Sequence, residues 1–113
     1  MADGVEIVLD RPRRVSYTWG DLKALQTRLG KPTGEIVADL GKLDVNAIQH
    51  LLFAGLHHDD ARLRFDDVGG LIEQYVAGGK TLGDVLWVIN EALTQSGYFG
   101  REAGGTGAPP KDA

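Results

Sequence analysis

The sequence contains no cysteine, which excludes disulfides, thiolate zinc centres and cysteine nucleophiles. It also lacks long apolar runs, and none approaches the roughly 20 residues needed to span a bilayer. The first residues, Met1 to Gly4, have neither the basic nor the apolar region of a signal peptide. We therefore expect a cytoplasmic protein with no membrane partner.

An excess of positive charge is absent as well. The chain has 12 basic and 16 acidic side chains, which give a formal net charge of −4. Nucleic-acid binding needs a clustered positive surface, and the only basic cluster is Arg11, Arg13 and Arg14 around Pro12. We interpret this cluster as solvated surface and expect no nucleic-acid partner.

What is present is an ordinary globular composition, 42% hydrophobic and 25% charged over 113 residues. This length suits one domain and leaves no room for two independent cores. We expect a single domain over residues 1–99. Residues 100–113 are rich in Gly and Pro and lack an apolar anchor, so this tail is predicted to be disordered.

The patterning predicts a mainly α fold, with an N-terminal β-hairpin followed by a bundle of about four to five helices. Two extended runs, 5–9 and 14–18, flank a turn containing Pro12. Thr18 with Asp21, and Thr81 with Asp84, resemble capping boxes that open helices. Apolar periodicity predicts helices over about 19–29, 35–40, 45–56, 66–77 and 82–96.

The residues predicted to face the core share three- and four-residue spacing within these helices. They are Trp19, Leu22, Leu25, Leu29, Ile36, Val37, Leu40, Val45, Ile48, Leu51, Leu52, Leu56, Val68, Leu71, Ile72, Tyr75, Val76, Leu82, Val85, Leu86, Ile89 and Leu93. The helix over 45–56 is apolar over more than half its circumference, so it is either central or covered by a partner.

Three residues are candidates for protein binding. Phe53 and Trp87 fall off the main apolar stripes, and Val88 lies beside Trp87. Tryptophan is enriched both at interfaces and in cores. We interpret Trp19 as a core or hairpin-packing residue and favour the core for Trp87 too, although Trp87 is the better interface candidate of the two.

One constellation has metal-binding chemistry: residues 57–60 read His-His-Asp-Asp, with His50 one heptad earlier. Imidazoles and carboxylates bind zinc, manganese or iron, and a small metal-dependent hydrolase using His50, His57 and Asp59 is one hypothesis. The alternative, which we favour, is a histidine interacting with a helix C-terminus and an aspartate capping the next turn.

Other catalytic templates fail. Residues 78–81 (GGKT) lack the first glycine of a phosphate-binding loop and no strand precedes them. No Gly-x-Ser-x-Gly elbow occurs. We therefore expect no catalytic, cofactor-binding or metal site, and a protein that binds other proteins and is not an enzyme.

Residues 51–60 (LLFAGLHHDD) and 63–72 (LRFDDVGGLI) resemble the tail assembly chaperones of long-tailed phages and gene-transfer agents. In that family a hydrophobic helix ends in an aromatic-Ala-Gly-Leu-x-His-x-Asp-like run, and a Leu-x-x-acidic-acidic-Val-Gly helix start follows. The N-terminal strand pair and the leucine-rich helix ending at Leu29-Gly30 also fit, so the resemblance covers roughly residues 5–98. The second histidine is a small departure from the pattern.

The resemblance implies a helical chaperone that coats the tape measure protein, keeps it soluble, recruits major tail protein subunits and leaves as the tube polymerises. It implies self-association and, in many members, a longer form made by ribosomal frameshifting. Such a protein would act in the host cytoplasm and be absent from the mature virion. A structural connector or tail-completion protein of the particle is the alternative within the same system.

Overall fold

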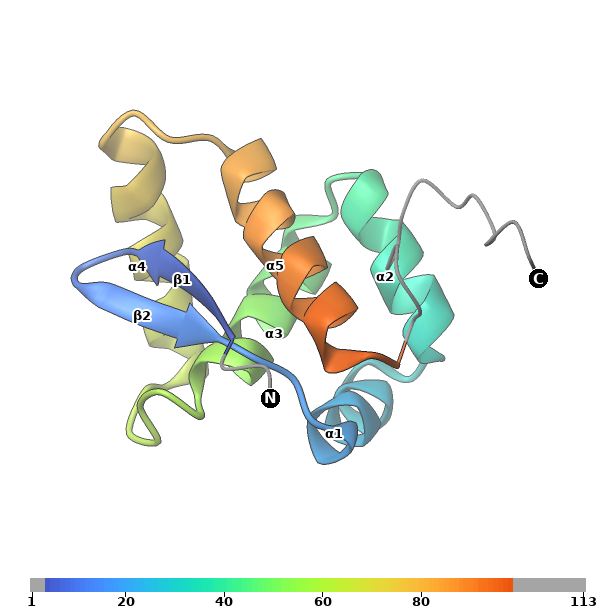
Figure 1. Cartoon of the computed structure of the whole chain (residues 1–113). Coiled ribbons are helices and arrows are strands. Elements are labelled where there is room, and N and C mark those ends of the chain that lie inside the picture. The colour runs from blue at the N-terminus through green and yellow to red at the C-terminus, as the bar shows by residue number, and fades with distance from the viewer. Residues whose placement is uncertain (1–3, 99–113) are drawn as a thin grey trace.

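The computed structural model describes residues 4–98 and is mainly helical with an N-terminal hairpin (Figure 1), which confirms the predicted fold class. The predicted tail over 100–113 lies outside the described residues. The elements are β1 Val5–Val8, β2 Pro12–Val15, α1 Trp19–Leu29, α2 Thr33–Gly41, α3 Val45–Leu56, α4 Phe65–Ala77 and α5 Leu82–Ser96. Among these helices, none combines the length and the apolar character needed to cross a membrane.

The hairpin pairs β1 with β2 in antiparallel register, with Val5 opposite Val15 and Ile7 opposite Arg13. The second strand begins earlier than predicted because Pro12 occupies its first position, where a missing N–H is tolerated. The inward face carries Ile7, Arg13 and Val15, all buried. An isolated hairpin is marginal in water, and this one packs on α3 and α5.

Helix boundaries follow the capping signals in the sequence. The Thr18 side chain accepts from the Asp21 N–H at 3.2 Å while the Asp21 carboxylate accepts from the Thr18 N–H at 2.8 Å. Thr81 and Asp84 form the same reciprocal pair at the start of α5. The ends of α1 and α5 are closed by Gly30 and Gly97 in left-handed conformation.

Helix α3 is the centre of the domain, one of the two outcomes its wide apolar face predicted. It contacts α1, α2, α4, α5 and β2. Its buried residues are Ala47, Ile48, Leu51, Leu52, Ala54, Gly55 and Leu56. Figure 1 shows α5 crossing in front of α3, with the hairpin and α4 on one side and α2 on the other.

The chain leaving the hairpin runs very close to the last turn of α3. The Ser16 N–H donates to the Gly55 carbonyl at 3.0 Å, and the Tyr17 hydroxyl donates to the Leu51 carbonyl at 2.6 Å. A Cβ placed on Gly55 would lie 2.5 Å from Val15 Cγ1 and 3.0 Å from Tyr17 Cζ. Gly55 therefore permits a backbone approach that any larger residue would obstruct.

Three residues predicted to face the core do not. Trp19 is 62% exposed and Val45 is 65% exposed. At about 100° per residue, Trp19 is offset by about 90° from the centre of the Leu22, Leu25 and Leu29 stripe, and it occupies the first residue of α1. Val45 likewise begins α3, and Val76, at 43% exposed, precedes the last residue of α4. The inward prediction was wrong at all three.

Candidate functional site

The His-His-Asp-Asp segment, residues 57–60, follows α3 and sends its side chains in two directions. His57 is the C-cap residue of α3, and the Asp59 and Asp60 N–H groups both donate to the Leu56 carbonyl in the turn that follows. The two imidazoles face α1, whereas the two carboxylates face the hairpin. We call this segment the 57–60 turn.

Both imidazoles of the 57–60 turn converge on one buried carboxylate. His57 Nε2 lies 3.1 Å from Asp21 Oδ1, and His58 Nε2 lies 2.5 Å from Asp21 Oδ2. The two rings lie side by side, with centroids 4.4 Å apart and planes inclined by 36°. Adjacent residues usually diverge, so this convergence requires the turn that His57 makes as it ends α3.

Asp21 holds this cluster from the start of α1. Its side chain is 8% exposed, and burial alone would raise its pKa. The hydrogen bonds from His58, from the Thr18 backbone and from His57 outweigh burial, so the pKa of Asp21 is lowered. Asp21 is thus a negative charge shared between a helix cap and two imidazoles.

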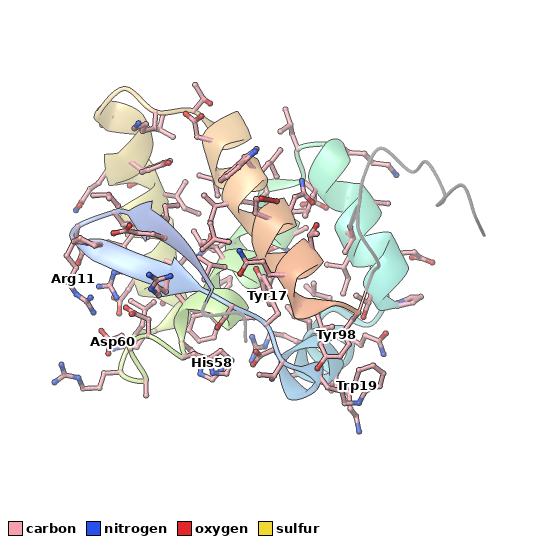
Figure 2. The ribbon with its side chains drawn as sticks, viewed as in Figure 1. Arg11, Tyr17, Trp19, His58, Asp60 and Tyr98 are labelled. Carbon is pink, nitrogen blue, oxygen red and sulfur yellow. The ribbon has the colours of Figure 1, made fainter. Side chains whose placement is uncertain are left out.

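The carboxylates of the 57–60 turn bind the hairpin arginines. Arg11 lies 3.4 Å from Asp59 and 3.6 Å from Asp60, while Arg13 Nη1 lies 3.5 Å from Asp60. Arg13 is only 5% exposed and also makes two hydrogen bonds to Asp10, at 2.8 and 3.0 Å. The interpretation of the arginine cluster as solvated surface was therefore wrong for Arg13. Figure 2 shows Arg11 and Asp60 close together beside the hairpin.

The residues of the hydrolase hypothesis have different surroundings. His50 stacks on the Phe65 ring with centroids 4.4 Å apart, and its Nδ1 is buried without a partner. His57 meets Asp21, and Asp59 meets Arg11. The structure instead groups Asp21, His57 and His58, whose ligand atoms lie within 4.8 Å of one another.

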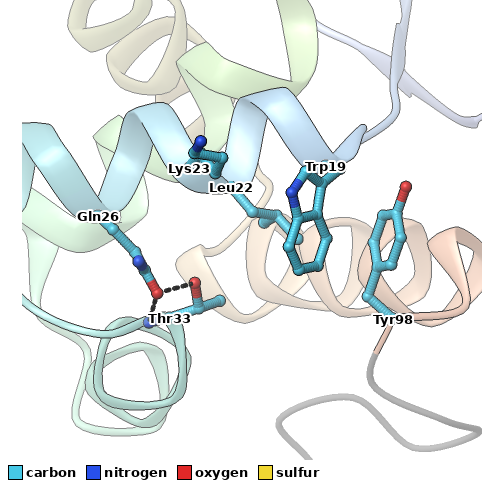
Figure 3. Close-up of a pocket in the computed structure, with 6 residues that line it drawn as sticks. All are labelled: Trp19, Leu22, Lys23, Gln26, Thr33 and Tyr98. Atoms are coloured by element: carbon cyan, nitrogen blue, oxygen red, sulfur yellow. Dashed lines mark hydrogen bonds between the residues drawn. The ribbon is translucent and has the colours of Figure 1, made fainter.

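A second candidate site is an aromatic cleft between α1 and the residues after α5. Trp19 and Tyr98 form its wall, with ring centroids 5.6 Å apart in an edge-to-face arrangement at 63° (Figure 3). The cleft encloses about 280 Å³, and its other lining residues are Leu22, Lys23, Gln26 and Thr33. Gln26 closes one end by accepting from the Thr33 N–H and hydroxyl, both at 2.9 Å.

The candidate protein-binding residues have three different environments. Trp87 is 61% exposed, on the side of α5 opposite its buried stripe. Phe53 is partly buried, with Arg28 Cζ 5.6 Å from its ring centroid and the Phe65 ring edge-on at 5.9 Å. Val88 is 5% exposed and belongs to the core. Its choice as a contact residue was wrong, because it lies 100° round the helix from Trp87 and faces inward.

Trp87 lies on α5, and Tyr98 of the aromatic cleft follows the end of the same helix. On α5, Glu91 lies four residues after Trp87, and Thr94 lies three residues after Glu91. These three side chains therefore share one side of the helix. The helix from Trp87 to Ser96 rises about 14 Å, and Tyr98 lies two residues beyond that end. We call Trp19, Trp87 and Tyr98 together the aromatic surface. Figure 2 shows Trp19 and Tyr98 side by side.

Comparison of the chain with models of protein families, with curated proteins and with solved structures finds no match. The two sites must therefore be interpreted by their chemistry. The aromatic surface offers amphipathic contact area, and the Asp21, His57 and His58 cluster offers two nitrogen ligands and one oxygen ligand.

Proposed function

We propose that this protein is a tail assembly chaperone of a long-tailed phage or gene-transfer agent. In this role it binds the tape measure protein, keeps it soluble and helps to recruit major tail protein subunits. The resemblance over residues 51–72 suggests the family, and the observation that carries the proposal is the aromatic surface. Trp19, Trp87 and Tyr98 are 62%, 61% and 47% exposed, and none of them belongs to the hydrophobic core.

Exposed tryptophan and tyrosine suit a chaperone of this kind. These side chains are enriched among the residues that dominate binding energy, because a rigid ring buries a large area at small entropic cost. A long helical client presents apolar side chains along one face, which can pack on the exposed aromatic groups at the start of α1, on α5 and just after it. Several copies along one client would also favour contacts between neighbours, hence self-association.

The test is co-expression of the full chain with fragments of the tape measure protein encoded beside it. The wild-type chain should raise the soluble fraction of at least one fragment and remain bound to it during affinity purification. Trp19→Ala and Trp87→Ala should each reduce this effect while circular dichroism shows an unchanged fold. Val76→Ala is the matched control, since it removes a 43% exposed apolar side chain from α4.

Failure of every tape measure fragment to be solubilised or retained would refute the proposal. Equal activity of the two tryptophan variants and wild type would instead refute the assignment of the aromatic surface. Mass spectrometry of purified particles separates the alternative, because a chaperone leaves the tail whereas a connector or tail-completion protein stays. Stoichiometric amounts in mature particles would favour that alternative.

A further inference from the structure

Three side chains of metal-binding type, Asp21, His57 and His58, meet where the 57–60 turn contacts α1. The proposed protein-binding role does not use them. Asp21 comes from the first turn of α1, and His57 and His58 come from the end of α3, 36 and 37 residues later in the chain. Their ligand atoms lie within 4.8 Å of one another. Among residues 4–98, this is the only group of three or more such side chains with that proximity.

We propose that Asp21, His57 and His58 form a binding site for a divalent transition-metal ion such as Zn²⁺. Two imidazole nitrogens and one carboxylate oxygen are a ligand set that zinc accepts, with water completing a tetrahedron. The ion would join the start of α1 to the end of α3. The site adds a metal-dependent cross-link to the fold and is independent of the proposed chaperone function.

The geometry is close to what an ion requires. Zinc bonds of 2.0–2.2 Å in a tetrahedron separate neighbouring ligand atoms by about 3.3–3.5 Å. His57 Nε2 lies 3.1 Å from Asp21 Oδ1 and His58 Nε2 lies 2.5 Å from Asp21 Oδ2, so each nitrogen must move away slightly from the oxygen it faces to admit an ion. The widest separation among the ligand atoms is at most 4.8 Å, so it must close by no more than about 1.4 Å to reach the tetrahedral value. The proposal therefore requires rotations of the two histidine side chains.

The three ligands divide into a fixed one and two accessible ones. Asp21 is 8% exposed and is held by its hydrogen bond with Thr18 in the capping box. The His57 and His58 side chains are 43% and 35% exposed, so the cluster borders solvent on the histidine side. Because Asp21 is fixed and the two histidines border solvent, a water molecule can occupy the remaining coordination position of the ion.

Charge at the cluster also favours a cation. The two carboxylate oxygens of Asp21 face the His57 and His58 nitrogens. The arginines of the hairpin are bound to the carboxylates of Asp59 and Asp60 on the other side of the 57–60 turn. These ion pairs leave Asp21 as the carboxylate that faces the two imidazoles.

The experiment is titration of the full chain with ZnCl₂ by isothermal calorimetry in a buffer that does not chelate metals. We expect one Zn²⁺ per chain, and no saturable binding of Mg²⁺, which prefers oxygen ligands. His58→Gln keeps a hydrogen-bond donor for Asp21 but removes the ligand nitrogen, and His57→Gln does the same at the neighbouring position. Each should weaken zinc binding at least about tenfold.

The third histidine provides the matched control, because His50→Gln also removes one imidazole but lies outside the cluster. It should leave zinc stoichiometry and affinity unchanged. Long-range ¹H–¹⁵N spectra of the wild-type protein serve as a measurement that needs no variant. Zinc should shift the Nε2 signals of His57 and His58 and leave those of His50 in place.

Two results would overturn the proposal. One is the absence of saturable zinc binding by the wild-type chain. The other is binding that His57→Gln and His58→Gln leave unchanged or that shifts the His50 signals instead, since the ion would then occupy a different place.

Discussion

The sharpest prediction concerns Gly55, whose substitution by alanine should destabilise the fold although it improves the helix. Alanine is about 1 kcal/mol better than glycine inside a helix. At this position, however, the added Cβ would lie 2.5 Å from Val15 Cγ1 and 3.0 Å from Tyr17 Cζ. Val15 is fully buried and Tyr17 is 6% exposed, so neither side chain has free space into which it can move.

Overpacking of this kind costs roughly 1–3 kcal/mol, and moving the hairpin exit outward would also stretch the Ser16-to-Gly55 hydrogen bond. After the helix gain is subtracted, we expect Gly55→Ala to lower the free energy of unfolding by up to about 2 kcal/mol. Gly70→Ala is the matched control, since Gly70 lies inside α4 and an added Cβ would meet nothing within 4 Å. That variant should gain about 0.5–1 kcal/mol.

Urea unfolding followed by circular dichroism at 222 nm measures both changes. Circular dichroism is preferable to tryptophan fluorescence because Trp19 and Trp87 are already exposed in the folded protein. Adding Val15→Ala to Gly55→Ala opens space for the new methyl group, so the two costs should be less than additive. A Gly55→Ala chain as stable as Gly70→Ala would refute the close-approach argument.

Two further predictions concern the partly buried His50 and the buried Tyr17. Burial, with the Arg28 charge, lowers the pKa of His50 below its usual value near 6.5, so the unfolded chain binds the proton first and stability should fall as pH drops below about 6.5. His50→Leu should flatten urea midpoints between pH 7 and 5 relative to wild type, and parallel pH profiles would contradict this. Tyr17→Phe removes the 2.6 Å hydrogen bond to the Leu51 carbonyl and should cost about 1 kcal/mol in the same assay, whereas an unchanged midpoint would show that the bond adds nothing.

Local signals in the sequence were sufficient for the elements of the fold. Capping residues and glycines act within a few positions of the helix ends they determine, which is why Thr18, Thr81, Gly30 and Gly97 marked those ends correctly. The wide apolar face of α3 predicted a helix that is either central or covered by a partner, and the structure shows that it is central. Periodicity failed at the first residues of helices: Val45 continues the stripe of α3 but is exposed, and Trp19 lies to one side of the stripe of α1.

The candidate sites were predictable only in part. The histidines of the 57–60 turn were visible as metal-binding residue types, but their partner Asp21 lies 36 residues away from His57 and already had a local explanation as a cap. Nothing in the pattern pairs a capping residue of one helix with the end of another. Tyr98 was missed for a related reason, since its contact with Trp19 joins the two ends of the helical region.

The packing of the hairpin against α5 has a consequence for how the chain matures during synthesis. The first elements to leave the ribosome, β1 and β2, contact the last helix, α5, so Ile7 and Val15 lack part of their cover until that helix has been made. A nascent chain that stops before residue 82 has no α5 and leaves the core open on that side. A segment translated after residue 98 would therefore leave the ribosome directly after α5, the helix that completes the core around the hairpin.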